Sequence, residues 1–139
     1  MKRSGYGKVR GLRPLGELEF EIMKVLWERG EATGREVWTA VKASRKAALT
    51  TVLTVIERLS NKGLVEKVRT GGPFVYRPLL TGEEFTRKAS AGMLRDYMEV
   101  SSASLIASFL DALSETDPEG MERLAELIRK KKKERDRDV

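Results

Sequence analysis

The stretch ALTTVLTVIERLSNKGLV, residues 48–65, changes its hydrophobic period partway along. Its first part carries apolar side chains at the spacing of one helix face, namely Leu49, Val52, Val55, Ile56 and Leu59. The sequence NKG at 61–63 is typical of a helix end. After Gly63, the runs LVEKVR and FVYRPL are β-rich with a period of two, and the glycines of TGGP between them suit a tight turn. The pattern predicts a helix and then a β-hairpin, with Pro78 on an edge strand or at a strand end.

Two further helices are predicted before this stretch. The first covers residues 15–29, with Leu18, Ile22, Val25 and Leu26 on its apolar stripe and Gly30 as its stop. Thr33 suits the cap of a second helix that ends near residue 45. Trp27 and Trp38 are expected in the core. The order helix, helix, helix, hairpin is that of a winged helix-turn-helix, in which the third helix is the recognition helix and the hairpin is the wing.

Three threonines on the third helix indicate what its outer face does. Thr50, Thr51 and Thr54 lie opposite the apolar stripe, although threonine is a mediocre helix former. A threonine hydroxyl can meet a phosphate or a base edge, and its methyl can pack on thymine. We therefore predict a face that enters the DNA major groove, flanked by phosphate-neutralising cations: Arg58, Lys62, Lys67 and Arg69. The alternative is a solvent face on which threonine bonds back to the carbonyl four residues earlier.

A different pattern begins at Thr81, which forms a predicted capping box with Glu84. The first amphipathic helix of this region reaches about residue 100, a second covers the stripe from Leu105 to Leu113, and Asp117 with Pro118 opens a third. Three such helices in so short a segment cannot bury a core alone and need a partner surface. The remaining segment, 129–139, is strongly charged and is expected to be frayed or disordered.

Composition narrows the class of function. The chain of 139 residues has no His and no Cys, which removes imidazole bases, thiol nucleophiles, disulfides and the usual zinc or copper sites. No phosphate-cradling loop or other pocket motif is visible, so we expect no enzyme, no metal and no cofactor. No apolar run approaches the roughly 20 residues of a membrane span, and no signal peptide is visible. The expected compartment is the cytoplasm.

The positive charge is unevenly distributed. Of the net +6, five charges lie in residues 1–14, a basic and glycine-rich arm without an acid. Residues 45–77 hold seven basic side chains against two acidic ones, whereas 15–36 is rich in glutamate. Clustering of one sign beside acidic surface is the electrostatic footprint of a polyanion binder.

Three segments together resemble the penicillinase-repressor family, the BlaI/MecI/CopY group of bacterial regulators. They are LGELEFEIMKVLWERGEATGREVW, LTTVLTVIERLSNKGLVEKV and VYRPLLTGEEF, in the right order with the right gaps. The resemblance covers about residues 14–128. It implies a homodimeric winged-helix repressor on a two-fold symmetric operator, with C-terminal helices that swap or intertwine. The dimer contacts it implies here are Met93, Tyr97, Leu105, Ile106, Phe109, Leu110, Leu113, Leu124 and Ile128.

The resemblance also suggests how such a repressor is released. In β-lactam-responsive members, a membrane sensor-protease pathway cuts an Asn-Phe bond in the second C-terminal helix, and the matching pair here is Ser108 and Phe109. That departure leaves cleavage by the same protease open. Copper-responsive members bind the metal through paired C-terminal cysteines, a route that a chain without Cys excludes.

The sequence thus predicts a mainly α protein. Its expected parts are a basic arm (1–14), a winged-helix DNA-binding domain (15–80), a helical dimerisation region (81–128) and a charged tail (129–139). The predicted function is transcriptional repression by a homodimer on double-stranded operator DNA, relieved by proteolysis or by loss of dimerisation. The alternative is a winged-helix module that binds another protein, in which Thr50 and Thr54 face that partner and binding lacks a steep salt dependence.

Overall fold

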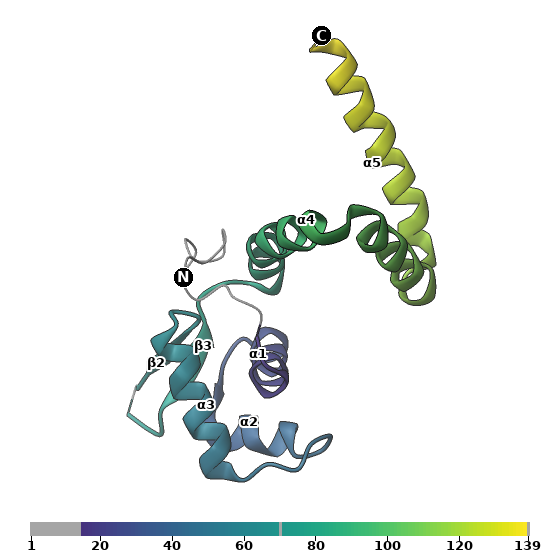
Figure 1. The fold of residues 1–139 in the computed structure, drawn as a ribbon. Helices are drawn as coiled ribbons and strands as arrows, with labels where there is room; N and C mark the ends of the chain where they lie inside the picture. The colour runs from purple at the N-terminus through teal and green to yellow at the C-terminus, as the bar shows by residue number, and fades with distance from the viewer. Residues whose placement is uncertain (1–14, 70, 139) are drawn as a thin grey trace. The chain divides into compact units, whose positions relative to one another are not determined.

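A computed structural model describes residues 15–69 and 71–138 of the chain (Figure 1). The elements are, in order, α1 (Glu17–Arg29), β1 (Ala32–Thr33), α2 (Gly34–Val41), α3 (Leu49–Asn61), β2 (Val65–Val68), β3 (Val75–Pro78), α4 (Gly82–Thr116) and α5 (Pro118–Arg137). The chain divides into two compact units, of which the first ends at Leu94 and the second begins at Arg95. The mainly α winged helix-turn-helix is confirmed, with three helices and a hairpin in the predicted order. The predicted N-terminal arm lies outside the described residues.

The sheet of the first unit has one strand more than predicted. Its order is β1-β3-β2, and both pairs are antiparallel. β1 is only two residues long, in a segment expected to be a loop, and it pairs Ala32 with Tyr76. This makes β3 the central strand, so Pro78 is tolerated because it is the last residue of that strand. Gly71 supplies the positive φ of 88° in the turn between β2 and β3.

The core lies where α1, α2 and α3 meet the sheet. The apolar stripes predicted for the three helices supply most of it, because every third or fourth side chain faces the same side. These buried residues include Ile22, Leu26, Val37, Val41, Val52, Val55, Ile56 and Leu59. Two predicted core residues lie at its edge instead: the half-buried indoles of Trp27 and Trp38 donate hydrogen bonds to the carbonyls of Leu80 (2.8 Å) and Ala47 (2.9 Å). Trp38 thereby holds the loop after α2, and Trp27 holds the segment between β3 and α4.

The beginning of α4 belongs to the winged-helix unit. Phe85 is buried in its core, and its ring centroid lies 5.4 Å from that of Trp27. Ala89 packs against the same core. A side chain on Gly82 would come within 3.5 Å of the Trp27 ring, which shows how closely the helix start approaches α1. The unit therefore extends beyond residue 80, where the sequence placed the end of the DNA-binding domain.

The second unit consists of the rest of α4 and α5. Ser101 interrupts α4 with a non-helical φ of −161° and ψ of 98°, close to the predicted helix end at residue 100. Its hydroxyl accepts a hydrogen bond from the amide of Ser104 at 3.2 Å, as a helix N-cap does. Asp117 caps α5 through the amide of Gly120, as predicted.

Helix α5 continues to Arg137, through the segment expected to be frayed or disordered. Lysine, arginine and glutamate are good helix formers, and an ion pair between Arg129 and Glu126 (2.5 Å) bridges one turn. None of the described helices is long and apolar enough to cross a membrane.

Candidate nucleic-acid interface

One face of helix α3 is polar and exposed to solvent, and the opposite face is buried in the core. Val52, Ile56 and Leu59 on the inner face have no solvent exposure. On the outer face Thr50, Thr51, Thr54 and Arg58 are exposed, as predicted. Rigid burial on one side fixes the orientation of the helix, so its outer side chains have defined positions.

The start of α3 is open to an anion. Its N-cap is Ala48, which provides no side-chain hydrogen bond to the first turn. The amides of that turn lack intrahelical partners, and the helix dipole adds a partial positive charge at the same end. Phosphate is a suitable ligand for such a helix start. Thr50 and Thr51 lie in this first turn, beside those amides.

The threonine hydroxyls are not equivalent. The hydroxyl of Thr54 donates to the carbonyl of Thr50 at 2.9 Å, which is the back-bond expected of a threonine on a solvent face. Its proton is thus used inside the helix, whereas its methyl and the oxygen lone pairs remain available. Among the described residues, Thr50 and Thr51 make no side-chain hydrogen bond. These two hydroxyls are the freer donors of the face.

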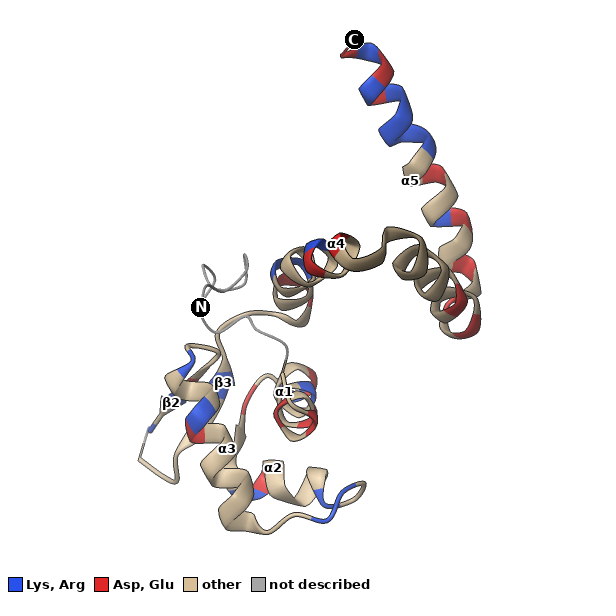
Figure 2. Ribbon diagram, in the orientation of Figure 1, with Lys and Arg blue, Asp and Glu red and all other residues tan. Residues whose placement is uncertain are grey.

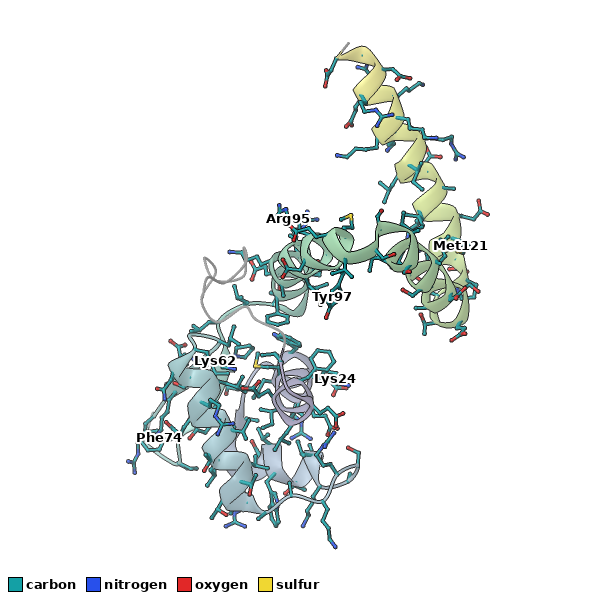
Figure 3. The ribbon with its side chains drawn as sticks, in the orientation of Figure 1. Lys24, Lys62, Phe74, Arg95, Tyr97 and Met121 are labelled. Atoms are coloured by element: carbon teal, nitrogen blue, oxygen red, sulfur yellow. The ribbon has the colours of Figure 1, made fainter. Side chains whose placement is uncertain are left out.

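The predicted contact Lys62 lies in a different environment from Arg58. Lys62 is half-buried, and its Nζ lies 2.7 Å from Oε2 of Glu19 on α1 (Figure 3). Glu19 is buried, which alone would raise its pKa. The hydrogen bonds from Lys62 and the Gly16 amide, with the charges of Lys62 and Arg58, outweigh that effect and lower the pKa. The charge of Lys62 therefore serves the α1–α3 contact.

The wing carries two cations arranged around one exposed ring. Lys67 Nζ lies 4.3 Å and the Arg69 guanidinium 5.0 Å from the centroid of Phe74, which is 40% exposed. Arg69 also donates to the Gly72 carbonyl at 3.1 Å. The wing cations predicted from sequence are thus brought together around Phe74, which lies on the wing (Figure 3).

Lys67 also links the wing to α3. Its Nζ lies 3.0 Å from Oε2 of Glu57, which accepts a second, longer bond from the Tyr76 hydroxyl (3.4 Å). The hydrogen bond to Glu57 raises the pKa of Lys67, and burial raises the pKa of Tyr76. Lys67 therefore remains charged at neutral pH, and its charge is partly balanced by the carboxylate of Glu57.

Some surface features near α3 were not predicted from the sequence. Arg35 on α2 and Lys42 at its C-cap lie 6.0 and 4.0 Å from the centroid of the Trp38 ring. A groove of about 330 Å³ runs between the start of α2 and the wing tip, lined by Thr33, Gly34, Arg35, Pro73, Phe74 and Tyr76. The alternation of FVYRPL gave no sign that Phe74 would stay exposed, because its position reads as the start of a strand.

The second unit exposes apolar side chains along both of its helices. Several predicted dimer contacts are largely exposed, including Tyr97 (55%), Ile106 (56%), Phe109 (49%) and Ile128 (46%). The other predicted contacts are half-buried: Met93, Leu105, Leu110, Leu113 and Leu124. Four further exposed apolar residues were missed, namely Met98, Val100, Met121 and Leu127. Ser108 is exposed, and its hydroxyl donates to the Ser104 carbonyl.

Several known proteins are similar to this chain in sequence. A transcriptional regulator BlaI of Mycobacterium tuberculosis is 40% identical over 86 residues, which are 61% of this chain and 59% of that protein. The penicillinase repressor of Bacillus licheniformis is 25% identical over 122 residues, covering 86% of this chain and 95% of that one.

A solution structure of monomeric Bacillus licheniformis BlaI in complex with the blaP half-operator aligns with a TM-score of 0.46 and 27% identity, over 51% of this chain and 87% of that one. The penicillinase repressor family profile matches residues 15–130. The chain therefore belongs to the penicillinase repressor family.

Proposed function

We propose that the chain is a DNA-binding transcriptional repressor that acts as a homodimer on a two-fold symmetric operator. Its family consists of transcriptional repressors, which are not enzymes, and this confirms the prediction that the chain is not an enzyme. In the proposed complex, α3 of each subunit enters the major groove and the wing follows the phosphate backbone.

One observation carries this proposal: the outer face of α3 is short, polar and exposed, while its inner face is completely buried. Short side chains let the helix backbone approach base edges closely. Thr50 and Thr51 offer hydroxyls, and the methyl of Thr54 offers an apolar surface for thymine. Arg58 continues the same face toward the helix end, where it can reach a phosphate or a guanine.

The second unit supports the homodimer. A monomer seldom exposes so many large apolar side chains on two successive helices as Tyr97, Val100, Ile106, Phe109 and Leu127. A second copy offers the same surface and can cover them in a closed pair. Joining two DNA-binding units also makes binding to the second half-site intramolecular. Loss of the dimer, by a signal or by proteolysis, would then release the operator without a change in any base contact.

Binding to duplex DNA at several salt concentrations tests the proposed function. The full chain should bind a random-sequence duplex with an affinity that falls steeply with salt, because phosphate contacts release counterions. Selection from a library of random duplexes should return a site with two symmetric halves. Salt-insensitive or absent DNA binding would favour the alternative, a winged helix that binds another protein.

Matched substitutions distinguish contacts to bases from sequence-independent contacts to phosphates. Thr51→Ala should reduce the preference for the selected site by about 1–3 kcal/mol, the usual value of one base contact, and leave random-duplex binding almost unchanged. Thr86→Ala, an exposed threonine on α4, is its control. Equal losses in both variants, or no loss in either, would remove α3 from the proposed base contacts.

A further inference from the structure

The C-terminal end of α5 is the most strongly charged surface of the second unit. Residues 95–128 carry a net charge of −6, whereas residues 129–138 carry seven basic and three acidic side chains, a net charge of +4. The whole of this segment is exposed, and it is helical to Arg137 (Figure 2). A positively charged stretch of helix therefore follows the part of α5 that carries apolar residues.

Most of the basic side chains at this end form no ion pair within the described residues. Among the described residues, Arg129 pairs with Glu126, and no ion pair is found for the other six cations between Lys130 and Arg137. In the winged-helix unit, by contrast, Arg45, Lys62, Lys67 and Arg77 each lie within about 3 Å of a glutamate. Other described cations, such as Arg35 and Arg58, are also outside any ion pair, but at the end of α5 six such cations lie within eight residues.

A protein partner is poorly suited to this segment. The apolar stripe of α5, which includes Met121, Leu124 and Ile128, ends where the basic residues begin. From Arg129 to Asp138 there is no apolar side chain that could form the core of a protein interface. A second copy packed on the stripe would leave this segment outside the apolar contact.

Duplex DNA has a charge density comparable to that of this segment and of opposite sign. Eight residue steps from Arg129 to Arg137 cover about 12 Å of helix axis at about 1.5 Å per residue. DNA presents about seven phosphate charges over the same length, at about 1.7 Å per charge. The segment carries seven cations and two carboxylates over that distance, a net charge of +5. Long lysine and arginine side chains can reach phosphates without any fixed register.

We propose that residues 129–137 of α5 form a second, sequence-independent DNA contact that binds phosphates outside the bases read by α3. This contact rests on the proposed function, since it acts on a chain already held at DNA. It adds affinity for any duplex and no preference for sequence. It also makes DNA binding more salt-dependent than α3 and the wing alone would.

The test compares two full-length variants that remove three positive charges each. In the first, Lys131, Lys132 and Lys133 are changed to Gln, which preserves helix propensity. In the control, the exposed α4 cations Arg87, Lys88 and Arg95 are changed to Gln. Affinity for a random 40-base-pair duplex is measured by fluorescence anisotropy between about 50 and 200 mM salt, the range over which phosphate contacts weaken strongly.

If two of the three lysines contact phosphate, the slope of log affinity against log salt falls by about 1.8. Between 50 and 200 mM salt the wild type then loses about 12-fold more affinity than the first variant, and the control keeps the wild-type slope. Equal slopes in all three proteins would overturn the proposal and leave the proposed function intact. A first variant that binds DNA normally but dimerises more weakly would also overturn it, in favour of a second copy. Absence of salt-dependent DNA binding in the wild type would instead refute the proposed function.

Discussion

Changing Lys62 to Met should destabilise the protein without affecting its contacts to DNA. Lys62 and Glu19 form a partly buried pair at 2.7 Å, with side-chain exposures of 30% and 11%. Exposed ion pairs contribute about 0–1 kcal/mol, and removal of one partner from a fully buried pair costs about 3–5 kcal/mol. We expect a loss of about 1–2 kcal/mol in the free energy of unfolding, because the Glu19 carboxylate keeps only the Gly16 amide as a hydrogen-bond donor. For a unit of this size the melting temperature should fall by about 5–12 °C.

Urea unfolding at neutral pH measures this loss, and a double-mutant cycle with Glu19→Gln isolates the pair. Arg58→Met serves as the matched control, since Arg58 is exposed and lies in no ion pair among the residues described. It should weaken DNA binding and reduce the salt slope by about 1, with little change in stability. If Lys62→Met instead reduced the salt slope and left the unfolding free energy unchanged, the assignment of Lys62 to the α1–α3 contact would be refuted.

Three other perturbations test the fold and the proposed dimer. The pKa of Glu19 is lower in the folded state, so the unfolded state binds more protons at acidic pH; the stability from this carboxylate is present above its unfolded pKa and lost as pH falls through the folded pKa. Urea titrations at descending pH should therefore show a steeper loss for the wild type than for Glu19→Gln, and parallel curves would contradict this cause. Phe109→Glu should yield monomers in light scattering and weak operator binding, whereas Ser114→Glu, an exposed position on the same helix, should remain dimeric. An unchanged dimer in Phe109→Glu would exclude this surface. Trp27→Phe removes the hydrogen bond to the Leu80 carbonyl and should lower the free energy of unfolding in urea by about 1 kcal/mol. An unchanged free energy of unfolding would show that the indole donor contributes nothing to stability.

Most of the fold could be predicted from the spacing of the hydrophobic residues along the sequence. The stripes of α1, α2 and α3 and the change of period after Gly63 predicted the elements and their order, because burial of one face imposes that spacing. β1 could not be predicted, since two residues carry no period and form a strand only by pairing with β3. The absence of an apolar stripe predicts a frayed or disordered end for α5, but the helix continues to Arg137 because intrinsic helix propensity is sufficient there.

The sequence predicted which residues of the candidate site face outward, but not which of its cations form ion pairs with other residues. Thr50, Thr51 and Arg58 face outward because helix geometry fixes their side once the stripe is known. Which cations remain free was not visible, because Lys62 and Lys67 meet glutamates that are distant in sequence, Glu19 by 43 residues and Glu57 by 10. Such pairings depend on tertiary packing. Phe74 stays exposed for the same reason, since its neighbours on the wing are cations rather than core residues.

The packing of Phe85 and Ala89 into the first unit bears on what a protease could achieve in this chain. A chain severed between Ser108 and Phe109 would retain both residues, and with them every buried apolar side chain of the winged helix. The amino-terminal product would stay folded and keep its α3 surface, while losing the apolar positions from Phe109 onward. If the proposed dimer forms through the second unit, cleavage at that bond would leave folded winged-helix units that lack part of the proposed pairing surface.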